Sequence, residues 1–299
     1  MIHVVYRSVG WENGKPRPQY YSKDLCLLSA LHAVEDHDAP VETIFLNDGE
    51  IPEERLALME ACGEVLQVAT PPGRARDGLL KGRGGSGVIR SHLEGMALAD
   101  SRGWSGEDMV YFVEDDYLHR PESLSKLAQA ADRVPGASYF GLYASIDRRR
   151  ARGFEIDDTL WLAAESTTLT FGARIAALRD DRWLHRFGLF ARGAMDLDVC
   201  LAYQGHRPHR WNRMIGSLFG KGPDAPLPPA GRLKMLSAQT AVNLLAVKQG
   251  FDPRLLIAPA SALATHMETP HLAPGFDWES LARETAARAA RDGRPPPAV

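Results

Sequence analysis

The chain has 299 residues, and its shares of hydrophobic (44%) and charged (24%) residues are ordinary for a soluble globular protein. A chain of this length is long enough for one large domain or two small ones. The net charge of −3 excludes the global basic excess that is typical of proteins whose main partner is nucleic acid.

Predicted strands and helices alternate in the first half of the chain. Short apolar runs and helical spacing predict strands at residues 2–7, 41–46 and 65–68 and helices at residues 23–33 and 52–62. Ser22 is expected to be the N-cap of the first helix. This alternation is typical of a parallel, doubly wound sheet.

A glycine-rich basic loop, residues 81–87, precedes a predicted helix at residues 88–101. Free backbone N–H groups and the helix dipole make such a loop a possible site for phosphate oxygens. No Gly-Lys-Ser/Thr sequence closes the loop, so it is not a Walker loop. A mobile surface loop remains an equal alternative.

The second half of the chain is less regular. We expect strands at residues 139–143, 167–172 and 255–257 and helices at residues 121–132, 173–182, 199–203, 232–249 and 278–291. The proline-rich residues 216–231 predict a long loop that is either disordered or a lid. Residues 295–297 are three prolines and are expected to form a frayed tail.

Three consecutive carboxylates, Glu114, Asp115 and Asp116, follow the apolar run at residues 110–113. An apolar run of this kind is typical of a strand buried on both faces of an α/β sheet, and ligands bind at the carboxyl ends of such strands. Adjacent carboxylates repel one another, so a site that holds them close usually supplies a cation. Oxygen ligands favour Mg²⁺ or Mn²⁺. The alternative is an exposed acidic turn after a core strand.

The cysteines and the N-terminal residues indicate the cellular compartment in which we expect the protein. Cys26, Cys62 and Cys200 are scattered, which favours a reducing environment over a disulfide framework or a zinc site. No apolar segment has the length of a membrane span, and residues 1–6 lack the features of a signal peptide. We therefore expect a cytoplasmic protein that makes at most peripheral contact with a membrane.

Together these features resemble the GT-A glycosyltransferases, which move a sugar from a nucleotide-sugar donor. The resemblance covers residues 2–277 and rests on short motifs and their order. Glu114-Asp115-Asp116 is similar to the metal-binding Asp-x-Asp motif of the family. On that match, Asp116 would bind Mn²⁺ or Mg²⁺, and Asp115 or Glu114 would assist or contact the ribose.

The resemblance also implies residues that hold the nucleotide. Residues 47–49, Asn-Asp-Gly, resemble the Asp-Asp-Gly at the end of the family's second strand, so Asp48 would recognise the base or ribose. Arg7 stands where the donor nucleotide enters. Arg7, Arg83 and Arg90 would share the negative charge of the leaving diphosphate.

Residues 195–199, Met-Asp-Leu-Asp-Val, resemble the Glu-Asp-x-Asp-Leu pattern of inverting members, whose second residue is the catalytic base. Asp196 is therefore the expected base, with Asp198 as the second candidate. A methionine replaces the usual glutamate here. His266 matches the histidine that completes the metal site in many members, with His271 as the alternative.

The implied fold is a single α/β domain with a mixed, mainly parallel GT-A sheet flanked by helices. Residues 1–118 would form the nucleotide-sugar-binding half, residues 119–277 the acceptor-binding half, and residues 278–299 a C-terminal helix with a flexible tail. The implied activity is metal-dependent, inverting transfer of a hexosyl group. The donor would be a nucleotide-diphosphate sugar, with a UDP-sugar favoured, and the acceptor a glycan, a lipid-linked sugar or a small molecule.

Other interpretations stay open at this point. A sugar-phosphate nucleotidyltransferase shares a related sheet, but residues 9–15 carry only a poor version of its glycine-rich signature. A non-catalytic protein that binds nucleotide sugars or glycans would need no base. Asp48 alone could cap a turn, and Asp196 and Asp198 could be the acidic first turn of a helix.

Overall fold

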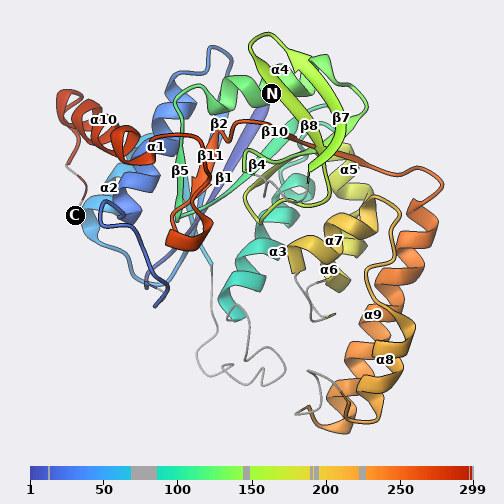
Figure 1. Ribbon diagram of the computed structural model, residues 1–299. Helices are drawn as coiled ribbons and strands as arrows, with labels where there is room; N and C mark the ends of the chain where they lie inside the picture. Colours follow the sequence, from blue (N-terminus) through green and yellow to red (C-terminus); the bar gives the residue numbers. More distant parts are fainter. Residues whose placement is uncertain are drawn as a thin grey trace.

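The structure is a computed structural model that describes residues 1–12, 14–68, 86–143, 149–188, 191, 195–221, 227–295 and 297 (Figure 1). Its centre is a sheet with nine strands among the described residues, in the order β3-β2-β1-β4-β9-β6-β10-β8-β7. In that order, the strands are Glu64–Gln67, Val41–Asp48, Ile2–Val9, Met109–Glu114, Phe171–Arg174, Ala137–Phe140, Leu255–Pro259, Thr159–Ala164 and Arg149–Ile156. A separate pair of short strands, β5 (Tyr117–His119) and β11 (Ala264–His266), lies beside it.

The strand directions define a mixed sheet. β1 is parallel to β2 and β4, β2 is parallel to β3, and β10 is parallel to β6. β9 is antiparallel to its neighbours β4 and β6, and β8 is antiparallel to β10 and β7. All strands of the sheet except β8 and β9 therefore run the same way. The predicted α/β class with a mixed, mainly parallel sheet flanked by helices is confirmed.

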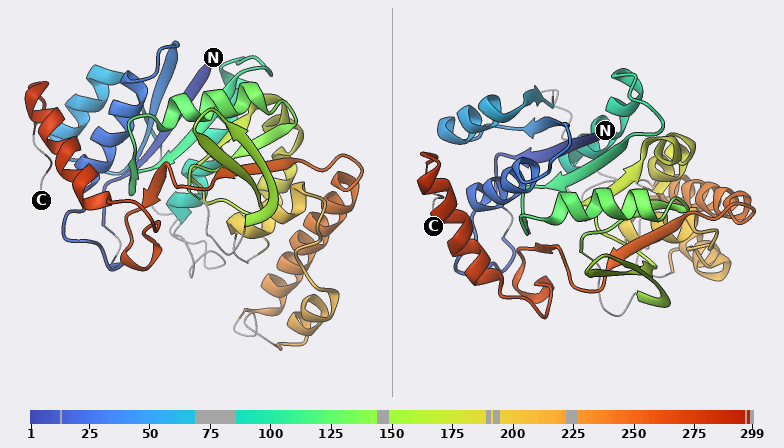
Figure 2. Two further views of the ribbon diagram at one scale, coloured as in Figure 1. Left: turned by 45° about the horizontal axis from the view of Figure 1, so that its top comes forward. Right: turned by 90° about the horizontal axis from the view of Figure 1, so that it is seen from above.

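Helices cover both faces of the sheet (Figure 2). They are α1 (Lys23–Glu35), α2 (Glu53–Cys62), α3 (Ser86–Ser101), α4 (Ser123–Arg133), α5 (Ile175–Asp180), α6 (Arg182–Gly188), α7 (Met195–Tyr203), α8 (Trp211–Leu218), α9 (Pro229–Gln249) and α10 (Trp278–Arg291), with a 3₁₀ turn at Thr269–His271. Apolar residues of α3, α5, α6, α7 and α9 form the core on one face. Residues of α1, α2 and α4 form the core on the other face, and α10 packs on the outside of α1.

Strand β1 shows why the apolar runs become central strands. Val5 faces the α3 side, whereas Val4 and Tyr6 face the α1 side. All three side chains are buried, because successive side chains of a strand point to opposite faces and helices cover both. The first helix also begins as predicted, since Ser22 Oγ accepts a hydrogen bond from the Leu25 backbone N–H at 3.2 Å.

The strand predicted at residues 167–172 begins later than expected, at Phe171, and the following helix is Ile175–Asp180. The threonines before Phe171 hydrogen-bond locally: Thr168 Oγ1 accepts from the Thr170 N–H at 3.3 Å, and Thr167 Oγ1 donates to the Thr170 carbonyl. Such side-chain bonds offer the backbone an alternative to a sheet ladder.

Two regions for which we predicted no helix or strand contain regular secondary structure. β7 and β8 form a hairpin whose turn contains Asp157 at φ 51°, a conformation that aspartate tolerates. Within the predicted loop at residues 216–231, α8 ends at Leu218 and α9 begins at Pro229; residues 222–226 lie outside the described part. Proline is compatible with the first turn of a helix, because the N–H that it lacks has no partner within the helix there.

Gly10 is packed against the backbone where β1 ends. A Cβ at this position would lie 2.1 Å from the Glu50 carbonyl oxygen, while the Gly10 N–H donates to the Asp48 carbonyl at 3.0 Å. Gly10→Ala should therefore push the ends of β1 and β2 apart and cost about 1–3 kcal/mol of unfolding free energy in a urea titration. Gly14→Ala is the matched control, since a Cβ there meets no atom within 4 Å. Equal stability of the two variants would contradict this packing.

Candidate functional site

Several of the predicted site residues meet at one edge of the sheet. β1 is paired with β2 so that Val9 lies beside Asp48, and with β4 so that Arg7 lies beside Glu114. Because these strands are parallel and adjacent, their carboxyl ends stand side by side. Both Arg7 and Asp48 are buried.

Asp116 and His266 come together although 150 residues separate them in the sequence. The antiparallel pairing of β5 with β11 sets His266 opposite Tyr117, directly after Asp116, and the rings of Tyr117 and His266 stack with centroids 5.0 Å apart. His266 Nε2 lies 3.0 Å from Asp116 Oδ2. Arg17 Nη2 donates to the same oxygen at 2.9 Å. Burial acts to raise the pKa of Asp116, but His266 and Arg17 outweigh it and hold this pKa at about 2.

This pair of atoms, hydrogen-bonded to each other here, would supply two of the ligands that a divalent ion needs. Two ligand atoms on adjacent corners of an octahedron with bonds of about 2.1 Å are about 3 Å apart. The separation of 3.0 Å between Asp116 Oδ2 and His266 Nε2 matches that spacing. One carboxylate oxygen and one imidazole nitrogen suit Mn²⁺. Glu268 Oε2, at 3.9 Å from His266 Nε2, is a further oxygen close by.

His271, the alternative histidine, is placed differently. Its ring stacks on the outer side of His266 with centroids 6.0 Å apart, and its side chain is 56% exposed. Its Nε2 lies 3.8 Å from Glu268 Oε1, so this histidine contacts Glu268 while His266 contacts Asp116. His271 is therefore a suitable control residue for experiments on His266.

Asp115 points toward the loop after β1. Its Oδ2 lies 3.0 Å from Lys23 Nζ and accepts a hydrogen bond from the Val9 N–H at 2.9 Å. Lys23 Nζ also donates to the carbonyls of Val9 and Trp11. Burial raises the pKa of the Asp115 carboxyl in spite of the nearby Lys23. These contacts fix the loop that leads from β1 to α1, which is a structural duty that the sequence did not predict.

Glu114 and Arg7 form an ion pair on the α3 side of the sheet. Arg7 Nη2 lies 2.9 Å from Glu114 Oε1, and the Arg7 side chain is 4% exposed. Burial raises the pKa of Glu114, although Arg7 acts to lower it. Within the described part of the chain, the buried Nε and Nη1 of Arg7 make no hydrogen bond. Orphaned guanidinium donors of this kind are rare, and water or a ligand would supply the missing oxygens.

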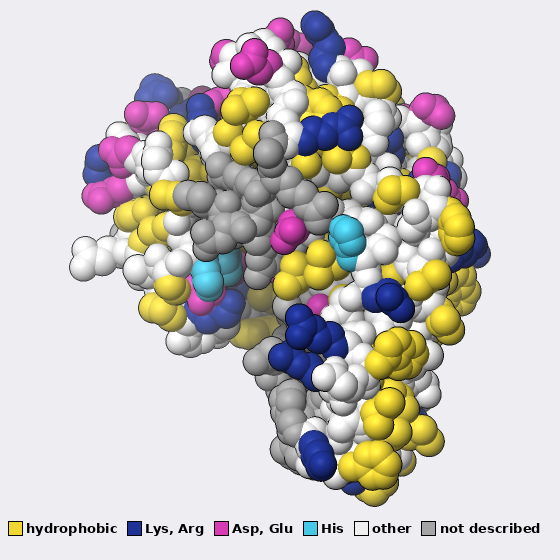
Figure 3. All heavy atoms as spheres, turned by 45° about the vertical axis from the view of Figure 1, so that its right-hand side comes forward, with side chains coloured by type: hydrophobic (Ala, Val, Ile, Leu, Met, Phe, Trp, Pro, Cys, Tyr) yellow, Lys and Arg dark blue, Asp and Glu magenta, His cyan; other side chains and the backbone are white. Residues whose placement is uncertain are grey.

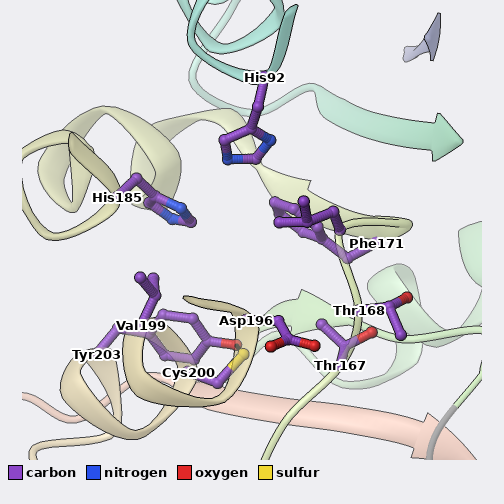
Figure 4. A pocket seen from close by; sticks show the side chains of 10 residues that line it. His92, Thr167, Thr168, Phe171, His185, Asp196, Val199, Cys200 and Tyr203 are labelled. Carbon is purple, nitrogen blue, oxygen red and sulfur yellow. Dashed lines mark hydrogen bonds between the residues drawn. The ribbon is translucent and has the colours of Figure 1, made fainter. Parts of the chain in front are cut away.

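A small pocket of about 20 Å³, room for about one water molecule, lies between α3, α6, α7 and the threonine segment before β9 (Figure 4). Asp196 lines it together with mainly aromatic, aliphatic and hydroxyl side chains. The full lining is His92, Thr167, Thr168, Leu169, Phe171, His185, Asp196, Val199, Cys200 and Tyr203. Its apolar lining with a few convergent polar groups is of the kind found in small-molecule sites, although the pocket itself is much smaller than a bound sugar.

The threonine segment connects this pocket with the acidic strand end. Thr170 Oγ1 accepts a hydrogen bond from the Glu114 N–H at 3.0 Å. Thr168, which lines the pocket, hydrogen-bonds the side chain of Tyr117, the residue that stacks on His266. His92 lies on the opposite wall of the pocket. Burial lowers the pKa of His92, and the positive charges of Arg7 and His185 lower it further. The threonine segment therefore links the pocket to the acidic cluster, although none of the acidic cluster's residues lines the pocket.

Asp196 and Asp198 occupy the first turn of α7. Asp196 lines the pocket, whereas Asp198 does not. Burial and the neighbouring charge of Asp196 raise the pKa of Asp198 to about 6. Both carboxylates thus stay candidates for a base, and the geometry favours Asp196.

Two buried histidines make the fold sensitive to acid. Burial lowers the pKa of His119 and of His185 to about 4, against about 6.5 in an unfolded chain. Between these values the unfolded chain binds more protons, so stability is expected to fall as pH drops from about 6.5 toward 4, by about 1.4 kcal/mol per pH unit for each histidine at most. Urea titrations across this range measure the slope. His185→Phe should reduce it, the exposed His271→Gln should not, and an unchanged slope in His185→Phe would contradict the assignment.

The structure adds residues that the sequence patterns did not single out. Arg17 donates a hydrogen bond to Asp116, and Lys23 forms an ion pair with Asp115. His92 and His185 reach the pocket from two different helices. Arg17 lies in a loop and Lys23 is the first residue of α1, so neither belongs to a periodic pattern that would have pointed to the acidic triplet.

Some predicted residues cannot be placed. Arg83 and most of the glycine-rich loop at residues 81–87 lie outside the described residues, as does the side chain of Arg90. Their expected contact with a diphosphate stays a prediction. The halves predicted at residues 1–118 and 119–277 share one continuous sheet, and their separate binding duties also stay predictions.

No protein-family model matches the chain, and the curated proteins contain no match. Among solved structures, the chain is similar to S. aureus TarS, with 15% sequence identity and a TM-score of 0.41; the match covers 80% of this chain. The chain spans only 42% of the length of TarS. The M. tuberculosis glucosyl-3-phosphoglycerate synthase matches at 14% identity and a TM-score of 0.37, over 83% of this chain and 80% of that one.

A further similar structure is 4-diphosphocytidyl-2C-methyl-D-erythritol synthase, at 13% identity and a TM-score of 0.36, over 64% of this chain and 80% of that one. The M. tuberculosis synthase has also been solved with Mn²⁺, uridine diphosphate and phosphoglyceric acid; that match, at 16% identity and a TM-score of 0.30, covers 47% of this chain and 42% of that one.

Proposed function

We propose that this protein is a metal-dependent, inverting glycosyltransferase that moves a sugar from a nucleotide-diphosphate sugar, with a UDP-sugar favoured, to an acceptor hydroxyl. The observation that carries the proposal is the pair of Asp116 and His266, whose ligand atoms lie 3.0 Å apart at the end of a central strand. This pair stands at the ligand-binding edge of the sheet, beside the Arg7–Glu114 ion pair.

The donor would lie across the carboxyl ends of β1, β2 and β4. Asp48, buried at the end of β2, would contact the nucleoside, and the unfilled donors of Arg7 would bind oxygens of the diphosphate or the sugar. Asp116 and His266 would hold Mn²⁺ or Mg²⁺. Bound there, such an ion would neutralise the negative charge that grows on the leaving diphosphate. Arg17, which already contacts Asp116, would add positive charge on the same side.

The attacking hydroxyl of the acceptor would enter the small pocket beside the donor. Asp196 would take the proton from the attacking hydroxyl, while Thr167, Thr168 and Tyr203 line the space around the acceptor. The transition state of glycosyl transfer resembles an oxocarbenium ion, and a carboxylate opposite the leaving group suits a single displacement with inversion. Asp196 lies on α7, away from β4 in the chain, so the base and the diphosphate site come from separate elements.

Calorimetric titration of the protein with UDP, GDP and CDP, each with and without Mn²⁺, tests the proposal. We expect one diphosphate to bind at least about tenfold more tightly with Mn²⁺, and a matching nucleotide sugar to be hydrolysed slowly without acceptor. Tighter binding of a nucleoside triphosphate, with release of pyrophosphate, would instead indicate a nucleotidyltransferase. Binding of a nucleotide sugar without any turnover would indicate a non-catalytic binding protein.

A further inference from the structure

Helices α8 and α9 form a hairpin that projects from the body of the protein (Figure 1). Large apolar side chains are exposed along this hairpin (Figure 3). They are Trp211, Ile215 and Phe219 from α8 and its end, and Leu233, Leu244, Val247 and Phe251 from α9 and its end, with exposed fractions from 45% to 89%. Contiguous exposed apolar surface of this kind marks a contact with another phase or partner.

The exposed residues of α9 form a stripe on one face. At 100° per residue, Leu233, Leu244 and Val247 lie within about 60° of one another around the helix axis. Met235 and Val242 lie on the opposite face and are buried in the protein. α9 is thus apolar on two faces, and the protein covers only one of them. Core packing explains the inner face and leaves the outer one without a structural reason.

The hairpin is also strongly basic. Residues 206–251 contain seven lysine and arginine residues and one acidic residue, a formal charge of +6, whereas the whole chain carries −3. The rest of the chain therefore carries −9. Most of these basic side chains are exposed, and none joins an ion pair with another described residue. They are Arg207, Arg210, Arg213, Lys221, Arg232, Lys234 and Lys248.

We propose that the α8–α9 hairpin docks on the surface of a bilayer that contains anionic lipids. Apolar side chains between lysines and arginines are the composition of a helix that lies in the membrane interface. The basic residues would be drawn to anionic headgroups, and Trp211, Ile215 and Phe219 would enter the boundary with the acyl chains. The proposed contact is peripheral, with the hairpin lying in the interface. Among helices in the described ranges, none is long and apolar enough to cross a bilayer.

The charge distribution orients the docked protein. An anionic surface attracts the hairpin and repels the remainder of the chain, which carries the acidic excess. The apolar residues lie on a projecting, convex element (Figure 2), and a fluid bilayer accepts a convex surface without a matching groove. Two copies that paired through this face would bring together two hairpins of formal charge +6, and this repulsion favours the bilayer.

Docking would bring the pocket close to the membrane. α9 packs against α6 and α7, and these two helices contribute His185, Asp196 and Val199 to the pocket. On the function proposed above, this position favours an acceptor that a lipid carries. The docking itself does not depend on that function, so binding to vesicles and sugar transfer can fail separately.

Co-sedimentation with lipid vesicles tests the proposal. The full-length protein should bind vesicles of phosphatidylcholine with phosphatidylglycerol, bind pure phosphatidylcholine vesicles far less, and lose binding as salt rises. The triple variant R210Q/R213Q/K234Q should bind the anionic vesicles about a hundredfold more weakly, at about fivefold for each basic residue lost. I215S/F219S/L244S should also weaken binding. All six side chains are exposed, so both variants should unfold at the temperature of the unmodified protein.

The matched control removes positive charges outside the hairpin, mainly from the C-terminal helix. R283Q/R291Q, together with R133Q on α4, changes the same number of positive charges and should bind like the unmodified protein. Absence of vesicle binding, equal binding to neutral vesicles, or equal loss in the control would overturn the proposal. So would a stable dimer that binds no vesicles and that the hairpin variants dissociate, because the hairpin would then contact a second copy.

Discussion

Replacing Asp196 with asparagine is expected to lower the rate of sugar transfer by about a hundredfold to ten-thousandfold. Asparagine keeps the size of the side chain and its place in the pocket, but it cannot accept the proton of the acceptor hydroxyl. The nucleotide should bind as before, because Asp196 lines the pocket and does not belong to the cluster at the end of β4. Initial rates of transfer, measured beside calorimetric binding of the nucleotide diphosphate, separate the two effects.

Asp198→Asn is the control for that experiment. Asp198 shares the first turn of α7 but is absent from the pocket lining, so its replacement should change transfer by less than about tenfold. The pKa of Asp198, raised to about 6 by burial and by Asp196, would suit a base near neutral pH. If Asp198→Asn stops transfer and Asp196→Asn does not, the base is Asp198. If neither variant loses activity, α7 does not supply the base.

The central strands were predictable because their residues are apolar without interruption. In β1 and β4, buried side chains point to both faces of the sheet, so the sequence pattern and the environment agree. The capping interaction of Ser22 was predictable for a similar reason, since it depends on residues three positions apart. Interactions between residues close together in the chain can therefore be recognised from the sequence.

Pairings between distant segments leave no such pattern. β5 and β11 have three residues each, and neither run is long enough to predict a strand; their pairing depends on the fold that brings residues 117 and 266 together. The antiparallel insertion of β9 between β4 and β6 has the same origin. The start of β9 was misplaced because hydroxyl groups of the preceding threonines hydrogen-bond the local backbone.

In the candidate site too, the local features could be predicted from the sequence, whereas the contacts between distant residues could not. Glu114, Asp115 and Asp116 could be predicted as site residues from their position after a strand. The sequence could not show that their three side chains point in different directions. In the structure Glu114 pairs with Arg7, Asp115 holds the loop after β1, and Asp116 contacts His266. The side chain directions follow from the end of the strand, where alternation between faces gives way to a turn.

Replacing Asp116 with asparagine, or His266 with glutamine, is expected to weaken the binding of Mn²⁺ by about tenfold or more and to remove the Mn²⁺-dependent part of nucleotide binding. Asp116→Asn removes the negative charge of the carboxylate, and His266→Gln removes the imidazole nitrogen that lies 3.0 Å from it. Electron paramagnetic resonance of free Mn²⁺ measures the first effect, and calorimetry with the nucleotide diphosphate measures the second. Neither readout depends on turnover.

His271→Gln is the matched control, because it alters a histidine that stacks on His266 but does not reach Asp116. Its effect on Mn²⁺ binding should be less than about threefold. Thermal unfolding of each variant shows whether the fold is kept, since Arg17 retains its hydrogen bond to the Met267 carbonyl at 2.7 Å when Asp116 loses its charge. Should His271→Gln and His266→Gln weaken Mn²⁺ equally, the ion would sit at Glu268, which both histidines approach. Should Asp116→Asn leave Mn²⁺ binding unchanged, Asp116 would not be a metal ligand and would serve only in the ion pair with Arg17. The guanidinium group of Arg17 would then be the positive charge that faces the diphosphate.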